Sequence, residues 1–341
     1  MTLTGPDVRI LQIHPTRRCN LRCLHCYSSS GPRERSELGA PLLLNAVSDA
    51  ASLGYNVLSV SGGEPLLYSH LESICSRAHR HGMITTLVTN GTIITERKMH
   101  DLRYLVDMIA VSLDGTPERH NRLRGSDRAF HRMEARLNLV RQAGIPFAFV
   151  FTLTNENLPD LEWVADFAVH QGATMLQVHP LDESGRACDE MPGQVLADQQ
   201  TGTAWMVVEC LREIFRGKLM IHFDALNRYQ LPVKPDAVAD WLRDFENGRR
   251  SLGEILSPLV IEDDGSVVPL RYGFPKSFAL GSLHTHTLSQ LAEVWKHRHA
   301  ADFCRLYTNA LRQVRDSDRM FANLYETLSQ GAELVALRAG C

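Results

Sequence analysis

Short apolar runs alternate with amphipathic stretches through the first two thirds of the chain. Stretches of roughly 10–18 residues with a helical pattern separate runs that are typical of buried strands. In one of them Leu161, Val164, Ala165 and Ala168 share a face at the spacing i, i+3, i+4, i+7. We predict strands at 8–14, 56–60, 84–88, 108–112, 147–152 and 175–179.

Six strands joined by helical crossovers indicate a parallel sheet with right-handed connections. Six are too few to close an eight-stranded barrel. We therefore predict an α/β fold, a curved and partly open (β/α)6 barrel. The carboxyl ends of its strands are where ligands bind in such sheets.

The pattern changes near 232–236, so we predict a barrel over 1–232 and a small α+β extension over 233–341. Apolar runs at 257–261 and 267–270 flank an Asp-Gly turn, which favours a β-hairpin. Leu288, Leu291, Ala292 and Trp295 mark a helix, and the tail over 301–337 reads as helical and amphipathic.

Composition narrows the range of partners. The chain has 341 residues and a net charge of −3 with scattered basic residues, so we expect no nucleic-acid partner. No apolar run approaches the roughly 20 residues that cross a bilayer, and no basic segment precedes an apolar one at the start. We expect a cytoplasmic protein without a membrane partner, whose eight cysteines bind metal or stay as buried thiols.

Three of these cysteines, Cys19, Cys23 and Cys26, are spaced C-x-x-x-C-x-x-C directly after the first predicted strand. Thiolates in this number suit iron–sulfur clusters or zinc. A structural zinc site needs four protein ligands, so three cysteines leave one position vacant. Zinc stays possible, with His25 or His14 as the fourth ligand.

Polar clusters follow the next three predicted strands. The second strand ends in Ser61-Gly62-Gly63-Glu64-Pro65, where two glycines let the backbone approach a ligand and Glu64 offers a carboxylate to a cation. The third runs into Thr89-Asn90-Gly91-Thr92 and the fourth into Ser112-Leu113-Asp114-Gly115. Each of these segments could also be a simple turn.

The cysteine spacing, with His25 and Tyr27 on either side of Cys26, resembles the signature of the radical S-adenosylmethionine (radical SAM) enzymes. The resemblance implies that the three cysteines hold a 4Fe–4S cluster, and that the fourth iron binds the amino and carboxylate groups of S-adenosylmethionine (SAM). It also implies the partial barrel predicted above.

Other segments resemble further motifs of this family. Gly62-Gly63-Glu64 is similar to its GGE motif, which holds the methionine ammonium of SAM. The resemblance further implies that Asn90, Ser112 and Arg124 contact SAM, together with His25 and Tyr27. Val178 would lie at the edge of the adenine pocket.

Some residues near the predicted site stay ambiguous. His179 precedes a proline and must be extended, which aims it at the top of the sheet, as a general base or as a packing residue. The polar loop 182–186 either reaches over the substrate or is simply solvated. Asp114 is either a ligand of the cofactor or only a turn former.

The extension resembles the SPASM or twitch domains of peptide- and metabolite-modifying relatives, but it departs from them. Where those relatives place a cysteine, this chain has Pro269-Leu270-Arg271. The remaining thiols are dispersed, and we expect Cys75, Cys210 and Cys304 to be buried on helices. We therefore predict that no second cluster is present.

The resemblance implies that a reduced cluster cleaves SAM to a 5′-deoxyadenosyl radical, which abstracts hydrogen from the substrate. The substrate is either a ribosomal peptide or natural-product intermediate, or a small metabolite such as a sugar or nucleoside. A flavodoxin or ferredoxin would donate the electron. The alternative from another class is a zinc-stabilised binding protein without catalysis.

Overall fold

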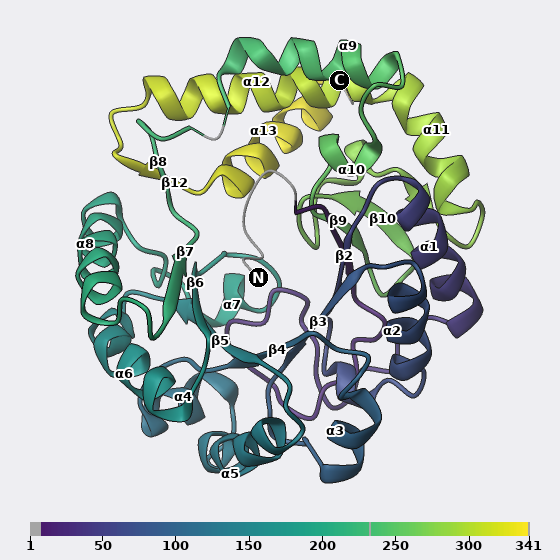
Figure 1. The fold of residues 1–341 in the computed structure, drawn as a ribbon. Coiled ribbons are helices and arrows are strands. Elements are labelled where there is room, and N and C mark those ends of the chain that lie inside the picture. Colours follow the sequence, from purple (N-terminus) through teal and green to yellow (C-terminus); the bar gives the residue numbers. More distant parts are fainter. Residues whose placement is uncertain (1–7, 232, 340–341) are drawn as a thin grey trace.

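The computed structural model describes residues 8–231 and 233–339. Seven parallel strands form the barrel wall: β1 (Ile10–Ile13), β2 (Val57–Val60), β3 (Ile84–Thr89), β4 (Met108–Ser112), β5 (Phe147–Leu153), β6 (Met175–Pro180) and β7 (Met220–Phe223). The helices between them are α1 (Ala40–Ser52), α2 (Leu71–Arg80), α3 (Glu96–Leu102), α4 (Pro117–Arg124), α5 (Ala129–Gln142), α6 (Leu161–Gln171), α7 (Ala187–Glu190) and α8 (Asp198–Ile214). Figure 1 shows the strands as an open ring with most of these helices outside it.

The six predicted strands are present, and β7 is a seventh that the sequence pattern did not reveal. It is only four residues long, and His222 interrupts its apolar residues. Its apolar run is therefore too short to predict a strand. Leu176 and Val178 of β6 and Ile221 and Phe223 of β7 are buried in the main core. The strand alternation places the polar residues between them on the opposite face.

The rest of the chain forms an extension that shares this sheet. Its elements are β8 (Leu226–Asn227), α9 (Val238–Glu246), α10 (Leu252–Ile255), β9 (Leu259–Ile261), β10 (Ser266–Pro269), β11 (Gly281–Ser282), α11 (Leu288–Arg298), α12 (Ala300–Asp316), β12 (Phe321–Ala322) and α13 (Leu324–Ala339). The sheet has ten strands in the order β11-β10-β9-β1-β2-β3-β4-β5-β6-β7. β9 pairs in parallel with β1, with Leu11 opposite Leu259, and antiparallel with β10.

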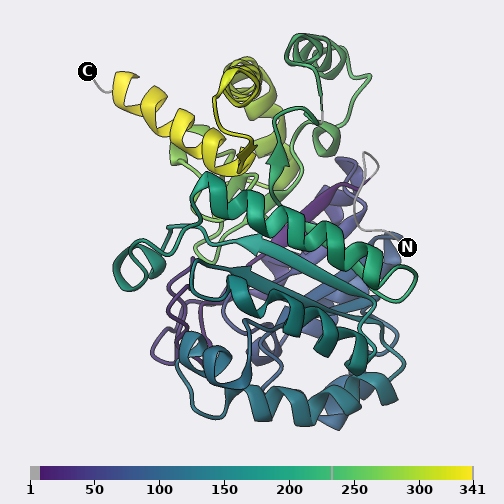
Figure 2. The ribbon, with the colours of Figure 1, turned by 90° about the vertical axis from the view of Figure 1, so that its left-hand side faces the viewer.

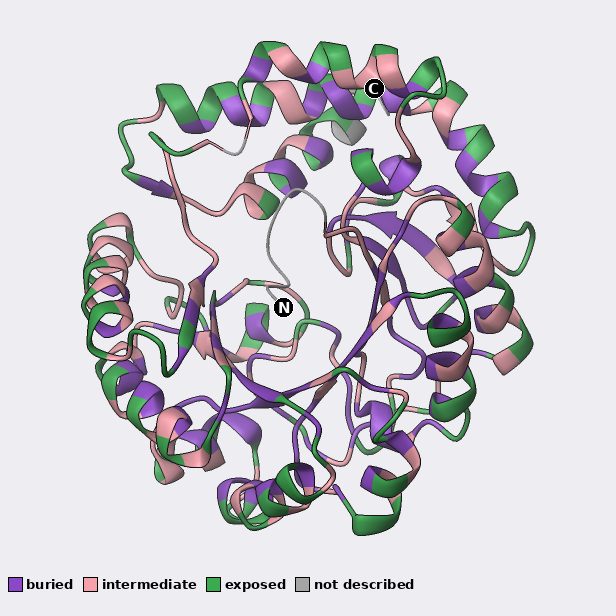
Figure 3. Ribbon diagram, in the orientation of Figure 1, coloured by how far each residue is buried: buried purple, intermediate pink, exposed green. Residues whose placement is uncertain are grey.

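The predicted helix faces explain how the extension packs. Leu288, Leu291, Ala292 and Trp295 are all buried on α11, and the Trp295 indole donates to the Phe278 carbonyl at 3.2 Å. Helices α9, α11 and α12 continue the outer ring, and Figure 2 shows the extension at one end of the molecule. In Figure 3 the strands are largely buried, whereas the outer helices expose one face.

The cysteines outside the loop are only partly as predicted. Cys75 on α2 and Cys304 on α12 are buried, which confirms the prediction for both. Cys210 is exposed, so its predicted burial is wrong: the buried face of α8 consists of Ala204, Val208 and Leu211. Within the described residues, no helix is long and apolar enough to cross a membrane.

Candidate iron–sulfur and cofactor site

The loop with Cys19, Cys23 and Cys26 follows β1 and leaves the sheet at its carboxyl edge. Cys19 and Cys23 are buried, and Cys26 packs against the same small cluster around Leu21. Backbone hydrogen bonds fix the loop: the Cys19 N–H donates to the Gly31 carbonyl at 3.2 Å, and the Leu24 N–H donates to the Leu123 carbonyl at 2.9 Å. Cys19 lies near enough to Cys23 and Cys26 for their charges to raise its pKa, so the three thiols are neighbours in this loop.

Glycines from three other segments hold this loop from outside. A Cβ on Gly63 would lie 2.2 Å from the Arg18 carbonyl oxygen, and one on Gly62 would lie 2.8 Å from that of Thr16. Likewise, Cβ atoms on Gly125 and Gly185 would lie 2.5 Å and 2.1 Å from the carbonyl oxygens of Arg22 and Tyr27. Gly62 and Gly63, predicted to approach a ligand, thus pack directly against the chain that leads into Cys19.

Glu64 has no exposed surface and uses its carboxylate inside the protein. It accepts hydrogen bonds from the Thr89 hydroxyl at 2.7 Å, the Asn90 N–H at 2.9 Å and the Leu66 N–H at 3.1 Å. Burial raises the pKa of Glu64, and these hydrogen bonds oppose the shift. Glu64 therefore ties the end of β2 to the end of β3.

Asn90 lies between this network and the first cysteine. Its side-chain amide is 3.8 Å from the Cys19 sulfur and donates to Asn20 Oδ1 at 3.0 Å. The Leu21 N–H also points at the Cys19 sulfur, at 3.5 Å. N–H groups aimed at sulfur are the contacts that tune iron–sulfur clusters.

A buried ion pair supports the second cysteine. Arg124 Nε donates to Asp114 Oδ2 at 2.5 Å, and its Nη1 lies 3.7 Å from the Cys23 sulfur. His25 Nε2 is 3.7 Å from the same Asp114 oxygen. Burial alone would raise the pKa of Asp114, but Arg124 and His25 outweigh it and lower this pKa to about 2. Burial lowers the pKa of His25 to about 4, so its imidazole is neutral near pH 7.

The Cys19 and Cys23 thiols are neutral at the same pH. Burial, followed by the Glu64 charge, raises the pKa of Cys19 to about 12, and burial raises that of Cys23 while Arg124 opposes the shift. Among the described residues, no three His, Cys, Asp or Glu side chains converge as they would around one metal ion. His14, the alternative zinc ligand, packs its ring 5.7 Å from that of Tyr27 and 4.8 Å from that of Tyr272.

The remaining predicted cofactor residues lie along the strand ends. Ser112 is buried at the end of β4, and the Tyr27 hydroxyl is 3.3 Å from that of Ser61. Val178 is fully buried in the core on the face of β6 opposite Gln177 and His179. Its side chain therefore does not face the barrel interior, and only its backbone can border a ligand there.

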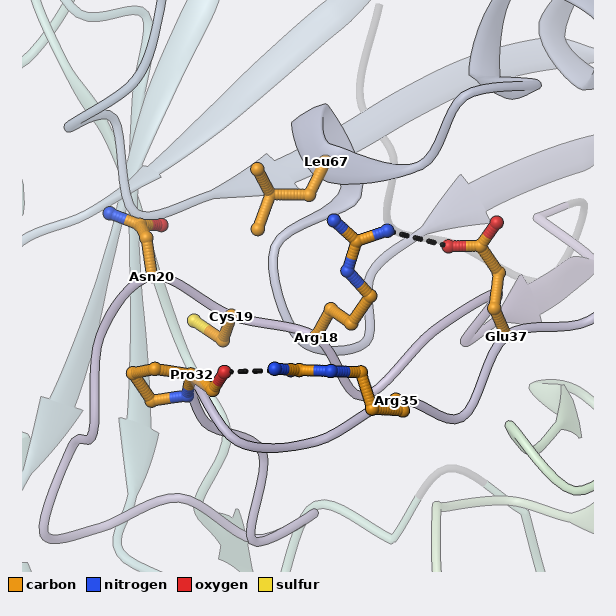
Figure 4. A pocket seen from close by; sticks show the side chains of 7 residues that line it. All are labelled: Arg18, Cys19, Asn20, Pro32, Arg35, Glu37 and Leu67. Carbon is orange, nitrogen blue, oxygen red and sulfur yellow. Dashed lines mark hydrogen bonds and ion pairs between the residues drawn. The ribbon is translucent and has the colours of Figure 1, made fainter.

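A hollow of about 670 Å³ opens beside Cys19. Figure 4 shows Cys19 between Leu67 and Pro32, with two arginines nearby. Arg18 Nη1 is 3.4 Å from Glu37 Oε2, and Arg35 donates to the Pro32 carbonyl at 2.9 Å. The hollow gives access to the cysteine loop at its first residues, Arg18 to Asn20.

Two features of the interior were not predicted from the sequence. Loop 182–186 turns back to the cysteine loop, where Arg186 donates to the carbonyls of Cys23 at 2.6 Å and Ser30 at 2.7 Å. His179 pairs with Asp224, just after β7. The alternation of His222, Phe223 and Asp224 was the available signal for the second feature, but it needed β7 to be recognised.

Comparison with known proteins shows which family the chain resembles in sequence. Residues 13–168 match the family model of the Radical SAM superfamily. A PqqA peptide cyclase of Ruegeria pomeroyi is 29% identical over 79% of this chain and 68% of its own length. An AdoMet-dependent heme synthase of Methanosarcina barkeri is 32% identical over 58% of this chain and 57% of its own. The chain thus spans only part of these relatives.

Solved structures share the fold at low identity. SuiB of Streptococcus suis, bound to its precursor peptide SuiA, superposes with a TM-score of 0.65 at 14% identity, over 91% of this chain and 67% of SuiB. The protein anSMEcpe, with bound AdoMet and a Cp18Cys peptide, gives a TM-score of 0.64 at 18% identity, over 97% and 98% of the two chains.

Proposed function

Because residues 13–168 place this chain in the Radical SAM superfamily, we propose that it is an enzyme with a 4Fe–4S cluster on Cys19, Cys23 and Cys26. The supporting observation is the set of three soft donors in one loop, with N–H groups aimed at two of the sulfurs. When bound, the cluster supplies the electron that cleaves SAM to methionine and a 5′-deoxyadenosyl radical, the species that abstracts hydrogen from substrate.

The protein's own groups then have distinct tasks. Asp114 fixes the Arg124 guanidinium, which donates to the Cys23 sulfur and favours its thiolate. Since Cys19 and Cys23 are protonated near pH 7, ligation of iron by their sulfurs would release protons to solvent. The proposed SAM contacts are Gly62, Gly63, Glu64, Asn90 and Ser112 at the strand ends, together with His25, Tyr27, Arg124 and the backbone at Val178.

For the substrate we propose a ribosomal peptide. Relatives named for peptide cyclisation, and neighbours of the same fold with bound peptides, support this choice. The second candidate is a small metabolite, favoured by the similarity to an AdoMet-dependent heme synthase and an Fe-coproporphyrin III synthase of Methanosarcina barkeri. A flavodoxin or ferredoxin is the proposed electron donor, and the hollow with Arg18 and Arg35 beside Cys19 suits an acidic partner.

The first experiment tests the cluster. Anaerobically reconstituted protein should carry about four irons and show the broad charge-transfer absorption of a 4Fe–4S centre. Cys23→Ala should abolish it, whereas the control Cys210→Ser, which changes an exposed thiol, should keep it. Full iron and sulfide in Cys23→Ala contradicts the assignment, and tightly bound zinc without sulfide would favour the non-catalytic alternative.

The second experiment tests the reaction and the substrate class. Dithionite-reduced protein should convert SAM to 5′-deoxyadenosine, measured by chromatography with mass detection. Two probes are then added in separate reactions and compared: a pool of synthetic peptides and Fe-coproporphyrin III. The peptide pool should raise 5′-deoxyadenosine above the substrate-free rate. A rise with the porphyrin alone would favour the metabolite candidate.

A further inference from the structure

A polar cluster lies on β6 and β7. Gln177 of β6 stands opposite His222 of β7 in the parallel register, and the Asp224 N–H donates to the Val178 carbonyl at 3.0 Å. The apolar neighbours of these residues are buried in the main core. In Figure 1, α6 and α8 lie outside these two strands. The polar face therefore looks into the barrel interior.

Asp224 is the centre of this cluster. Its Oδ2 pairs with Nδ1 of His179, and its Oδ1 accepts a hydrogen bond from the Gln177 amide at 2.8 Å. His222 Nδ1 lies 2.9 Å from the same Oδ1. Burial alone would raise the pKa of Asp224, but His179 and His222 outweigh it and hold this pKa well below its usual range. The carboxylate thus stays charged between two imidazoles.

His179 is oriented by this contact. Because Nδ1 is directed at the carboxylate, it carries the proton of the neutral imidazole. The other ring nitrogen, Nε2, then has the lone pair that can accept a proton. The His179 side chain is 46% exposed, so part of the ring is open to a ligand. Desolvation alone would lower the pKa of His179, but the Asp224 charge outweighs it and raises this pKa. This is the arrangement in which a carboxylate fixes the tautomer and orientation of a basic imidazole.

The extension faces the same cluster. β12 pairs with β8, with Ala322 opposite Leu226, and this brings the start of α13 near the end of β7. Burial and the Asp224 charge raise the pKa of Tyr325 to about 12, so its hydroxyl is neutral here. Beyond it, Glu326 faces Asp182, Arg271, Glu183 and Arg319. Arg271 in turn binds Asp182 at 2.5 Å.

We propose that His179 and Asp224 form an acid–base dyad that handles a proton of the substrate. His179 Nε2 takes the proton from a hydroxyl or an ammonium group of the substrate, which becomes an alkoxide or a neutral amine, and the imidazolium returns it later. Asp224 is the positioning residue that holds Nδ1–H and stabilises the imidazolium. The inference deepens the proposed function and rests on it, since it gives the substrate an ionisable O–H or N–H group.

The first test needs no substrate. Diethyl pyrocarbonate attacks neutral imidazole, and peptide mapping by mass spectrometry reports each histidine of the reconstituted full chain. His179 should react at Nε2, and more slowly at pH 6.5 than an unpaired imidazole, because the Asp224 charge raises its pKa. Asp224→Asn should speed this reaction, by up to tenfold for each unit by which the pKa of His179 falls. His286, an exposed histidine of the extension, is the internal reference and should not change.

The second test uses whichever probe raises 5′-deoxyadenosine, the peptide pool or Fe-coproporphyrin III. His179→Gln should keep its iron and lose about 100-fold in product formation. Asp224→Asn should shift the acidic limb of the rate–pH profile, which a merely structural role would leave in place. His286→Gln is the matched control, with the wild-type rate and profile.

Different results would overturn the proposed function and the His179–Asp224 dyad. Wild-type protein without 5′-deoxyadenosine formation overturns the proposed function. An unreactive His179, or a reactivity profile that Asp224→Asn leaves unchanged, overturns the dyad whatever the SAM assay gives. Wild-type turnover by His179→Gln overturns its catalytic role.

Discussion

Asp114 shows how far a single residue can differ from its local pattern. An Asp before Gly is a common turn former, and Gly115 indeed has a φ of +130°. Yet the Asp114 side chain has no exposed surface and binds Arg124, while its Oδ1 accepts from the Thr152 N–H at 3.3 Å. The sequence pattern indicated the turn; the long-range partners Arg124 and Thr152 exist only once β4, β5 and α4 have packed.

The lowered pKa of Asp114 predicts acid sensitivity. Its folded pKa of about 2 lies below the ordinary value of 3.8, so the charge contributes stability above pH 3.8 that is lost as pH falls towards 2. For the cluster-free chain we expect about 2 kcal/mol of unfolding free energy to disappear across this window. Urea unfolding between pH 5 and 2 measures it.

Asp114→Asn should be less stable at neutral pH, because it leaves Arg124 buried without its counter-charge. Its stability should also depend less on pH than that of the wild type. Asp127→Asn, at an exposed site near the same helix, is the control and should follow the wild-type curve. Parallel curves for Asp114→Asn and wild type would contradict this account.

At the scale of elements, the cysteine loop depends on segments that the sequence places far from it. The turn after β2, the end of α4 and the loop before α7 each bring a glycine against its backbone. The sequence predicts that Gly62 and Gly63 let the backbone approach a ligand, because neither residue carries a side chain. It could not identify the carbonyls of Thr16 and Arg18 as their neighbours, since these contacts depend on how β1 and β2 are aligned.

This packing predicts the effect of a single methyl group. Gly63→Ala would place a Cβ 2.2 Å from the Arg18 carbonyl oxygen and displace the chain one residue before Cys19. We expect a loss of about 1–3 kcal/mol in unfolding free energy, as at overpacked sites. Iron loading after reconstitution should fall with it.

The control is Gly39→Ala, at a site with φ of −66° whose nearest contact would be Pro41 Cδ at 4.0 Å. It should keep both stability and iron. If Gly63→Ala lowers affinity for SAM while its iron content stays at the wild-type level, the glycine faces the ligand rather than the loop.

The buried face of a helix can also be difficult to predict from the sequence. Cys210 on α8 was predicted to be buried, but the buried positions of this helix are Ala204, Val208 and Leu211. The apolar pattern of this helix fits two neighbouring faces, and packing on β7 selects one of them. For α11, whose apolar residues form a single stripe, the predicted face and the buried face agree.

For the whole molecule, the parallel strands β1–β6 and the partly open barrel were predictable from the sequence, because βα units are local and their apolar runs are clear. The cysteine loop and the strand-end segments were located for the same reason. The pairing of β9 with β1 could not be predicted, since it joins residues far apart in the chain. The cluster of His179 and Asp224 was missed because β7 was not recognised as a strand. The division at residue 232 stays a prediction, although both parts share one sheet.

The dispersed cysteines predict a single cluster. Leu270 is buried in the core beside β10, and Cys75 and Cys304 are buried on different helices. Fully reconstituted protein should approach about four irons per chain. A variant with Cys188, Cys210 and Cys304 changed to Ser should keep that number. Loading near eight irons that falls to four in the triple variant would reveal an auxiliary cluster.

The pairing of β1 with β9 also affects how the chain folds while it is being synthesised. β1 ends at Ile13 and β9 begins at Leu259, about 246 residues later. At a synthesis rate of about 5–20 residues per second, one edge of β1 stays open on the ribosome for roughly 12–50 s. β2 can cover the other edge within seconds. A nascent chain therefore presents the segment before its cysteines to chaperones, and to iron delivery, well before the last neighbour of that strand exists.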